Sequence, residues 1–370
     1  MNSYRNTRIA LLTLLALVPG LLAGCGRDGA GEEALKEVLS ESLLPAFEGD
    51  TAAVIVLASI AEAGSGRRPV SVLYYRRDDG GVYSGYHDHE DLPVPPGGIM
   101  QTATLTHFLD NGYIALSDSV PTRHGVLTEF RKASPPARND PFILDFEEDT
   151  GRDFISVREG FLKSYRYVTD RYVLDIVNRY AYAWDAYMDC FYDYFGPAGR
   201  SACRIPSSVR TCPVSRAHLA VADGSGLCLS QEQIVAFHRS LATGGVRPAY
   251  RYFPKKRICS EETAREVSAL LRENVLGGTC RDLQDCTVPV AARLGTGVVD
   301  SGFVTYYGDT EELGAVKTAS VAGFFPYDDP EYVLCVTCYS TEYPLYDFPK
   351  EAFKTIAEQL CSKPAYENER

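Results

Sequence analysis

Residues 91–122 have the outline of a catalytic segment, but the residues at its centre carry no catalytic group. A stretch rich in Pro and Gly, which cannot be helical, leads directly into residues 99–109, where apolar side chains recur at helical spacing. Gly112 ends the predicted helix, since glycine readily takes the left-handed conformation found there. A turn before a helix is a common way to present a catalytic group, because backbone N–H groups and the helix dipole converge at the N-terminus. The residues presented here are Gly98 and Gln101, and neither is a nucleophile or a base.

Residues 86–91 form a second group that could carry chemistry, here the binding of a metal ion. They contain two histidines among carboxylates and a tyrosine. His87 and His89 are two residues apart and could share a metal ion only on a strand or in a loop. No third ligand follows at a regular spacing. We therefore expect a solvated loop at this place, with no metal site and no cofactor.

The stretch at residues 91–122 resembles the active-site segment of the penicillin-binding serine D,D-transpeptidases. That segment reads Pro-Gly-Ser-x-x-Lys and continues into a buried helix that ends near a glycine. Pro96 and Gly97 match the Pro-Gly pair without a gap, and Gly112 matches the glycine at the end of the helix. The resemblance puts Gly98 in the place of the nucleophilic serine and Gln101 in the place of the lysine.

Further segments resemble the same family in the same order along the chain, over about residues 46 to 345. The second motif, S-x-N, corresponds to Ser164, which is kept, and to Arg166, which replaces the asparagine. The third motif, K-T-G-T, corresponds to Arg293, Leu294, Gly295 and Thr296. The other similar segments are residues 219–245, 277–279 and 320–333. Each segment alone is weak support, but their common order and spacing predict the fold.

The resemblance implies acyl-transfer chemistry whose main groups are replaced here. In the family the serine attacks a peptide carbonyl, the lysine takes its proton, and the third motif draws in a carboxylate and completes the oxyanion hole. Because all three motifs are altered, we expect no catalysis. The N–H groups of Gly98 and Thr296 could still form the hole, and Arg293 could still pair with a carboxylate. Together with Ser164 and Gly295 they form the predicted binding residues.

Three functional hypotheses follow. The first is a catalytically degenerate domain that binds peptidoglycan stem peptide or a cell-wall or divisome protein. The second is an active D,D-transpeptidase or carboxypeptidase that uses Ser164 as a non-standard nucleophile, although its neighbour Lys163 is aimed about 100° away in a helix. The third is a purely structural assembly protein whose groove is filled by bulky side chains such as Leu294 and Met100.

The charge of the chain excludes one class of partner. It has 370 residues and a formal net charge of -12. Its pI is near 5.1. Such a chain is repelled by nucleic acid and by anionic lipid surfaces, so we expect no nucleic-acid partner.

The first 25 residues are predicted to be a lipoprotein signal peptide. A basic region is followed by an apolar run that ends in Leu-Ala-Gly-Cys at Cys25, and this ending resembles the bacterial lipobox. We expect a cell-envelope protein that is anchored through a lipid on Cys25 at the periplasmic side of the inner or outer membrane. A plain signal peptide or an uncleaved anchor is the alternative.

Of the 11 cysteines, ten remain once Cys25 is set aside, and an even number permits disulfides in an exported protein. The closest pairs are Cys203 with Cys212 and Cys280 with Cys286. For each pair the alternative is two buried free thiols.

The predicted fold class is mixed α and β, a mostly antiparallel sheet flanked by helices with an inserted helical subdomain. A tether and first helix at residues 26–45 precede the domain at residues 46–365. Its sheet part covers about residues 46–95 and 286–365, and its helical part about residues 96–285. The predicted strands are residues 51–59, 69–76, 288–299, 302–307, 320–325 and 332–339. The predicted helices are residues 32–44, 230–242, 260–275 and 351–359, with one long helical stretch at residues 155–195.

The long helical stretch carries an aromatic row at steps of four and three residues. The row consists of Tyr180, Trp184, Tyr187, Phe191 and Tyr194. Such a row could stack the sugar rings of a glycan, but we expect a packed core face, because aromatic stripes are buried far more often than they bind ligands.

Overall fold

The computed structural model describes most of the chain from residue 31 to residue 362. The described residues are 31–77, 80–84, 92–122, 126–129, 142–145, 152–180, 182–195, 221–249, 254–299, 315–341 and 345–362. The predictions made for Cys25, His87, His89, Cys203, Cys212 and the strand at residues 302–307 lie outside these residues. Within the described part, every helix is too short or too polar to span a bilayer.

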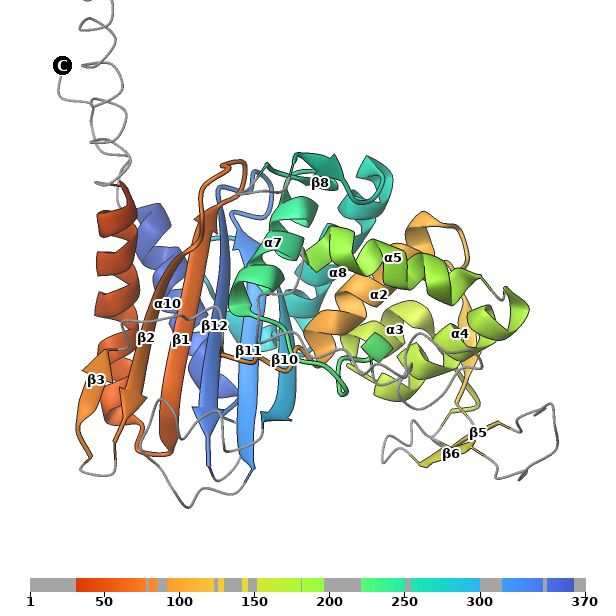
Figure 1. Ribbon diagram of the computed structural model, residues 1–370, viewed down its shortest axis with the longest axis horizontal. Coiled ribbons are helices and arrows are strands. Elements are labelled where there is room, and N and C mark those ends of the chain that lie inside the picture. The colour runs from red at the N-terminus through yellow and green to blue at the C-terminus, as the bar shows by residue number, and fades with distance from the viewer. Residues whose placement is uncertain are drawn as a thin grey trace, which may run out of the picture.

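The centre of the structure is a six-stranded antiparallel sheet in the order β10-β11-β12-β1-β2-β3 (Figure 1). Its strands are β1 (Ala53–Glu62), β2 (Val70–Arg76), β3 (Val82–Ser84), β10 (Ala291–Val299), β11 (Val316–Phe325) and β12 (Tyr332–Ser340). The sheet joins strands from both ends of the chain, because β12 pairs with β1. This arrangement leaves β10 at one edge, next to the helical part.

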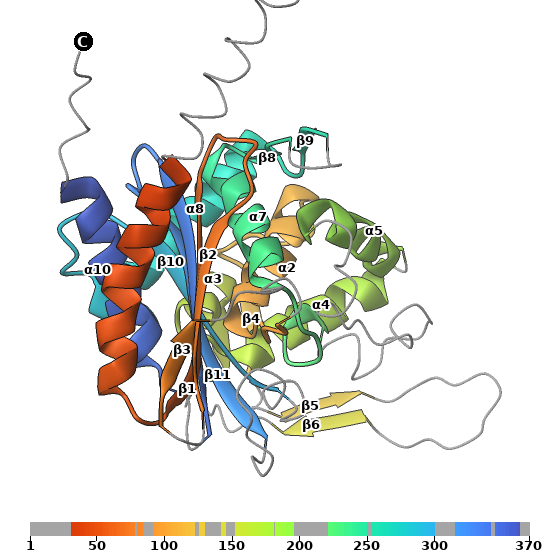
Figure 2. The same cartoon turned by 60° about the vertical axis from the view of Figure 1, so that its left-hand side comes forward.

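The central strands are mostly apolar because helices cover both faces of the sheet. Nearly every residue of β1, β11 and β12 is buried. Figure 2 shows the N-terminal helix (residues 31–49) and α10 (Asp347–Ser362) on one face and the other helices on the opposite face. The N-terminal helix belongs to the core rather than to the tether, since Leu39, Leu43 and Phe47 are fully buried against the sheet.

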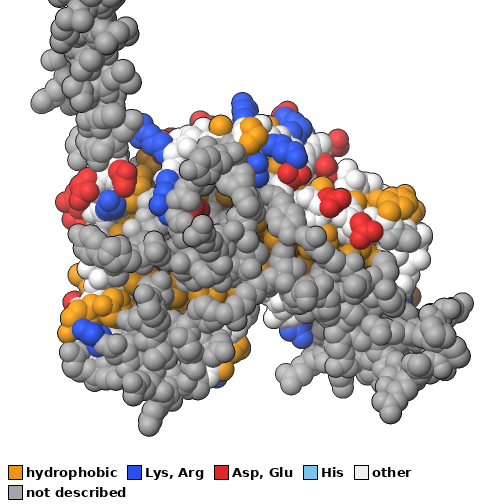
Figure 3. All heavy atoms as spheres, viewed as in Figure 1, with side chains coloured by type: hydrophobic (Ala, Val, Ile, Leu, Met, Phe, Trp, Pro, Cys, Tyr) orange, Lys and Arg blue, Asp and Glu red, His pale blue; other side chains and the backbone are white. Residues whose placement is uncertain are grey.

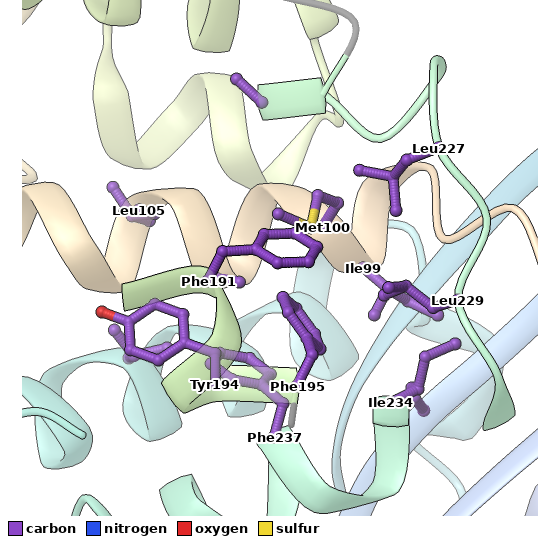
Figure 4. Close-up of a cluster of buried hydrophobic side chains, with 14 of the residues drawn as sticks. Ile99, Met100, Leu105, Phe191, Tyr194, Phe195, Leu227, Leu229, Ile234 and Phe237 are labelled. Carbon is purple, nitrogen blue, oxygen red and sulfur yellow. The ribbon is translucent and has the colours of Figure 1, made fainter. Parts of the chain in front are cut away.

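The helical part packs on the other face of the sheet around α2 (Gly98–Asp110), which is buried along almost its whole length. The surrounding helices are α3 (Val157–Leu162), α4 (Arg166–Arg179), α5 (Ala183–Phe195), α7 (Gln231–Ala242) and α8 (Glu261–Gly277). Figure 4 shows Met100 of α2 beside Phe191 of α5, with Phe195 and Phe237 below them. Short strand pairs lie at the margins: β4 (Ser119–Pro121) with β7 (Phe154–Ser156), β5 (Val126–Glu129) with β6 (Phe142–Asp145), and β8 (Val246–Arg247) with β9 (Lys256–Arg257).

The long helical stretch predicted at residues 155–195 is wrong in one respect, because it consists of three separate helices. Ser156 caps α3 by accepting a hydrogen bond from the Glu159 N–H. Ser164 then takes a φ of 58°, a left-handed conformation that interrupts the helix before α4. The aromatic row survives as a core face, since Trp184, Tyr187, Phe191 and Tyr194 are all buried. The predicted fold class is confirmed.

Candidate functional site

The structure brings the three motif positions together where β10, the N-terminus of α2 and the turn between α3 and α4 meet. Arg293 of β10 lies between Gly98 and Gln101 of α2 and Ser164 of the turn. The residues that the sequence singled out therefore occupy one site, although they are separated by up to 195 positions.

The centre of this site is the Arg293 side chain, which is fully buried. Its Nε donates to the carbonyl oxygen of Gly98 at 3.1 Å, and one terminal nitrogen donates to the Gln101 side chain at 2.8 Å and to Ser164 Oγ at 3.3 Å. The other terminal nitrogen donates to the carbonyl oxygen of Phe161 at 2.5 Å and to Asn274 Oδ1 at 3.3 Å. All five acceptors are neutral oxygens, so the guanidinium is held by dipoles and not by a carboxylate.

The surroundings of Arg293 keep it charged but remove it from water. Its guanidinium carbon lies 3.8 Å from the centre of the Phe161 ring, within the range of a cation–π contact. Burial lowers the pKa of Arg293 to about 10, so the guanidinium remains protonated at neutral pH. A protonated arginine cannot serve as a general base for Ser164, and it is too enclosed to meet a ligand.

Gly98, at the position of the nucleophile, has no room for a side chain. A Cβ atom added to Gly98 would stand 2.5 Å from the carbonyl oxygen of Leu294 and 3.2 Å from Ser164 Oγ. A Cβ on Gly97 would stand 2.2 Å from the carbonyl oxygen of Thr296. Backbone atoms cannot yield as a flexible side chain can, so the start of α2 and the edge of β10 are in direct contact.

The same contact continues along the edge strand. A Cβ atom on Gly295 would lie 2.0 Å from the carbonyl oxygen of Pro96, and one on Gly297 would lie 2.3 Å from the Pro95 side chain. Residues 95–98 therefore lie along β10 from Leu294 to Gly297. The N–H groups of Gly98 and Thr296, which were predicted to form an oxyanion hole, thus belong to two segments in direct contact.

Arg166 adds a contact across the outer side of the site. Its Nε lies 3.1 Å from Asp223 Oδ2, and Asp223 is buried while the arginine is about half exposed. Asp223 also accepts a hydrogen bond from the Ser225 N–H at 2.8 Å. The turn that holds these residues includes Gly224, where a Cβ would lie 2.5 Å from the Gly97 carbonyl oxygen. The residue that replaces the motif asparagine thus links α4 to the turn that covers Gly97.

The geometry can now be compared with known proteins. The sequence model of the family described as penicillin binding protein transpeptidase domain matches residues 146–360, which is more than half of the chain. The chain belongs to the penicillin-binding protein transpeptidase family. No curated protein matches the chain in a sequence comparison.

Several solved structures share the fold of this chain. The TP domain of penicillin-binding protein 3 from Burkholderia pseudomallei has a TM-score of 0.65 and 17% identity, with 89% of this chain and 94% of that chain covered. A peptidoglycan glycosyltransferase from Burkholderia ambifaria has a TM-score of 0.64 and 18% identity, with 89% and 95% covered. A peptidoglycan synthetase from Bifidobacterium adolescentis has a TM-score of 0.64 and 15% identity, with 89% and 59% covered.

Two sequence predictions about this transpeptidase-family site are corrected by the structure. The Leu294 side chain does not fill the groove, because it packs with the hydrophobic cluster on the opposite face of the sheet. Side chains alternate along a strand, so Leu294 points away where its neighbour Arg293 points in. Cys280 and Cys286 are both free thiols, one fully buried and one half-buried.

Two residues of the site were missed by the sequence analysis. Asn274 of α8 is fully buried, accepts from Arg293 and Thr279, and donates to the carbonyl oxygen of Ala292 at 2.9 Å. Asp223 is the partner of Arg166. Neither stands inside a catalytic motif, and only an asparagine on the apolar face of a predicted helix could have served as a signal.

Proposed function

We propose that this chain is a catalytically inactive penicillin-binding protein transpeptidase domain that is held in the cell envelope by a lipid on Cys25 and acts by binding a protein of cell-wall synthesis. The observation that carries the proposal is the buried Arg293 side chain in the place where the nucleophile, base and substrate carboxylate would meet. A site filled by its own arginine serves the fold rather than a reaction.

The absence of usable chemical groups at the motif positions supports the inactive assignment. Gly98 offers no nucleophile and Gln101 offers no base. In a comparable hydrolase, loss of the nucleophile lowers turnover on the order of a millionfold. Ser164 is the remaining hydroxyl, and its partner in the site is a protonated guanidinium that donates to it. An alkoxide cannot form there by general-base catalysis.

The burial of Arg293 favours a protein partner over a peptidoglycan stem peptide. A peptide bound in the family manner would need a free cation at the third motif for its carboxylate, whereas the Arg293 side chain at this position is buried and donates to five oxygens of the protein itself. A protein partner can instead bind the outer surface, which remains available whatever fills the groove. Stem-peptide binding remains the alternative outcome of the tests below.

The test is intact mass spectrometry of the purified protein after incubation with a β-lactam, with an active transpeptidase as positive control. We expect the control to gain the mass of the acyl adduct and this protein to keep its mass. An adduct on this protein would refute the inactive assignment. Repeating the experiment with Ser164→Ala would then show whether Ser164 is the nucleophile.

A second measurement addresses the type of partner. Titration of the protein with a synthetic stem pentapeptide, followed by calorimetry, is expected to give no heat of binding above that of dilution. Photo-crosslinking from the outer surface in cells is expected to capture proteins of cell-wall synthesis. Saturable peptide binding that is lost in Arg293→Met would favour the stem-peptide alternative.

A further inference from the structure

Two half-buried thiols, Cys286 and Cys361, lie in the layer behind the sheet, away from the candidate site. Cys286 follows a short 3-10 helix, η4 (Arg281–Leu283), and Cys361 stands in the last turn of α10. Both pack against the same hydrophobic cluster, which also contains Leu283 and Phe353. Both are free in the structure.

The contacts of Cys286 place it opposite one face of α10. The backbone N–H of Thr287, the next residue, donates to Glu358 Oε1 at 2.9 Å. The Glu358 carboxylate is also near enough to the Cys286 thiol to help raise its pKa. Glu358 and Cys361 are three residues apart, so they lie on the same face of the helix. Cys361 is therefore the next side chain along that face from the one that binds the residue after Cys286.

The electrostatic neighbours of the two thiols agree with this placement. Burial raises the pKa of Cys286, and Lys354, one turn before Glu358, counteracts part of that effect. Burial also raises the pKa of Cys361, and Glu331 and then Cys286 add smaller increases. One face of α10 carries all three of these side chains, because Lys354, Glu358 and Cys361 are spaced at four and three residues. This is the face that lies toward Cys286.

We propose that Cys286 and Cys361 form a disulfide bond that ties the C-terminal helix to the segment between α8 and β10. In this reaction the thiolate of one cysteine attacks the disulfide of an oxidant, forms a mixed disulfide and releases the oxidant's first thiolate. The thiolate of the other cysteine then attacks the protein sulfur of the mixed disulfide and displaces the oxidant's second thiolate. One protein S–S bond forms, and the oxidant's disulfide is reduced to two thiols that take up the two protons. In the cell the bond depends on the export that the proposed function includes, because disulfides persist in oxidising compartments.

The bond would connect α10 to the structure that holds Arg293 in place. The chain from Asn274, which accepts a hydrogen bond from Arg293, runs through η4 to Cys286 and on to β10. A bond from Cys286 to α10 would restrain the segment between α8 and β10 on the face of the sheet opposite the site. Cross-linking residues so far apart in sequence also reduces the freedom of the unfolded chain.

The experiment is thiol alkylation and intact mass spectrometry of the purified protein after incubation with oxidised glutathione, followed by peptide mapping. We expect the protein to become lighter by two hydrogen atoms and to yield a linked peptide pair containing Cys286 and Cys361. Cys361→Ser and Cys286→Ser should each abolish this pair, whereas Cys280→Ser, a change at the neighbouring buried thiol, should leave it intact. Reduction of the bond should lower the melting temperature of the wild type by roughly 3 to 6 °C and leave that of Cys361→Ser unchanged.

Full alkylation of both cysteines after oxidation, or a map that joins Cys286 to a different cysteine, would overturn the proposal. Because oxidation in vitro needs no export, this result is independent of the localisation. A β-lactam adduct would refute the proposed inactive function while leaving the disulfide result as it stands. If the serine variants fold poorly, the mass and melting temperature of the wild type with and without reductant still decide the question.

Discussion

Arg293 stands where the family resemblance predicts a substrate-binding cation, and its contacts there are with the protein itself. A guanidinium carries five N–H donors in a planar arrangement, and the site offers it five neutral oxygens on three different segments. A lysine at the same place has three donors and could not reach all of these segments. The charge is offset by the dipoles of backbone carbonyls and neighbouring side chains, so removal of the arginine would leave several buried acceptors without partners.

Gly98 is packed so closely against Arg293 and Leu294 that a side chain at this position would displace β10. This packing gives a prediction for Gly98→Ala. The added Cβ would lie 2.5 Å from the Leu294 carbonyl oxygen and 3.4 Å from Arg293 Nε, so β10 must move. We expect the free energy of unfolding to fall by about 1 to 3 kcal/mol, the range of overpacking in well-packed interiors. Urea denaturation at neutral pH measures it.

The matched control for Gly98→Ala is Gly277→Ala, at the end of α8. No atom of the described residues outside its own helical turn lies within 4 Å of a Cβ built at Gly277. Since alanine favours helix over glycine, this variant should be as stable as the wild type or more stable by up to about 1 kcal/mol. Equal stability of the two variants would show that the start of α2 can move away from β10 at little cost.

At the scale of single residues, the sequence predicted which residues meet at the site, but it did not predict that Arg293 would be buried there. The common order of the motifs brought Gly98, Gln101, Ser164 and Arg293 to one place, and the structure confirms that they meet. The sequence could not show that the arginine would turn inward and be buried. That outcome depends on Asn274 and on backbone carbonyls, which no motif specifies.

At the scale of elements, α5 shows why the aromatic row is a core face. Tyr187 is fully buried, and its hydroxyl group is 2.8 Å from the hydroxyl oxygen of Thr104 on α2. Phe191 packs at 4.8 Å between ring centres against Phe195. A row whose rings already contact each other and α2 has no face left for a sugar.

This packing predicts opposite results for two aromatic residues of the same region. Phe191→Ala removes a buried ring and should lower the free energy of unfolding by about 3 to 5 kcal/mol. Tyr182→Ala removes a ring that is 63% exposed, and it should change stability by less than about 0.5 kcal/mol. Thermal or urea unfolding of both variants provides the measurement. If the row were a glycan platform, Phe191→Ala would instead leave stability near that of the wild type.

The break between α3 and α4 could not be predicted from the periodic spacing of apolar residues. Apolar spacing continues across residues 155–195 and therefore predicted one helical stretch. The left-handed conformation of Ser164 interrupts it, and this conformation is rare for residues other than glycine, so composition gave no sign of it. The turn that results is what brings Ser164 Oγ to Arg293.

At the scale of the whole molecule, the acidic surface lies on the N-terminal helix, on the other face of the sheet from the candidate site (Figure 2 and Figure 3). Acidic side chains gather at the end of the molecule where the N-terminal helix lies (Figure 3). Glu33, Glu37 and Glu41 of that helix are exposed. A partner of this surface would be basic or neutral, in agreement with the net charge of -12. The sequence predicted one sheet built from both ends of the chain with a helical part inserted, and the pairing of β12 with β1 confirms it. The order of the strands within the sheet was not predicted.

The interior also makes the stability of the whole molecule depend on pH through two buried histidines. Burial lowers the pKa of His107 and of His238 from 6.5 to about 4. His107 packs against Phe108 and Tyr187, and neither ring nitrogen has a hydrogen-bond partner within the described part of the chain. Each histidine stays neutral in the folded state, whereas in the unfolded chain it takes up a proton below pH 6.5.

A histidine with a lowered pKa in the folded state leaves the stability unchanged above pH 6.5, lowers it progressively as the pH falls from 6.5 to about 4, and has no further effect below 4. Between pH 7 and pH 5 each of the two should therefore lower the free energy of unfolding by about 2 kcal/mol. His107→Phe, which keeps the ring packing and removes the titration, should lose about 2 kcal/mol less than the wild type over this interval. Urea denaturation at the two pH values compares the two proteins, and carboxylates that titrate in the same range affect both equally. An identical pH dependence in His107→Phe would mean that His107 already binds a proton in the folded protein and that the core around α2 and α5 is open to water.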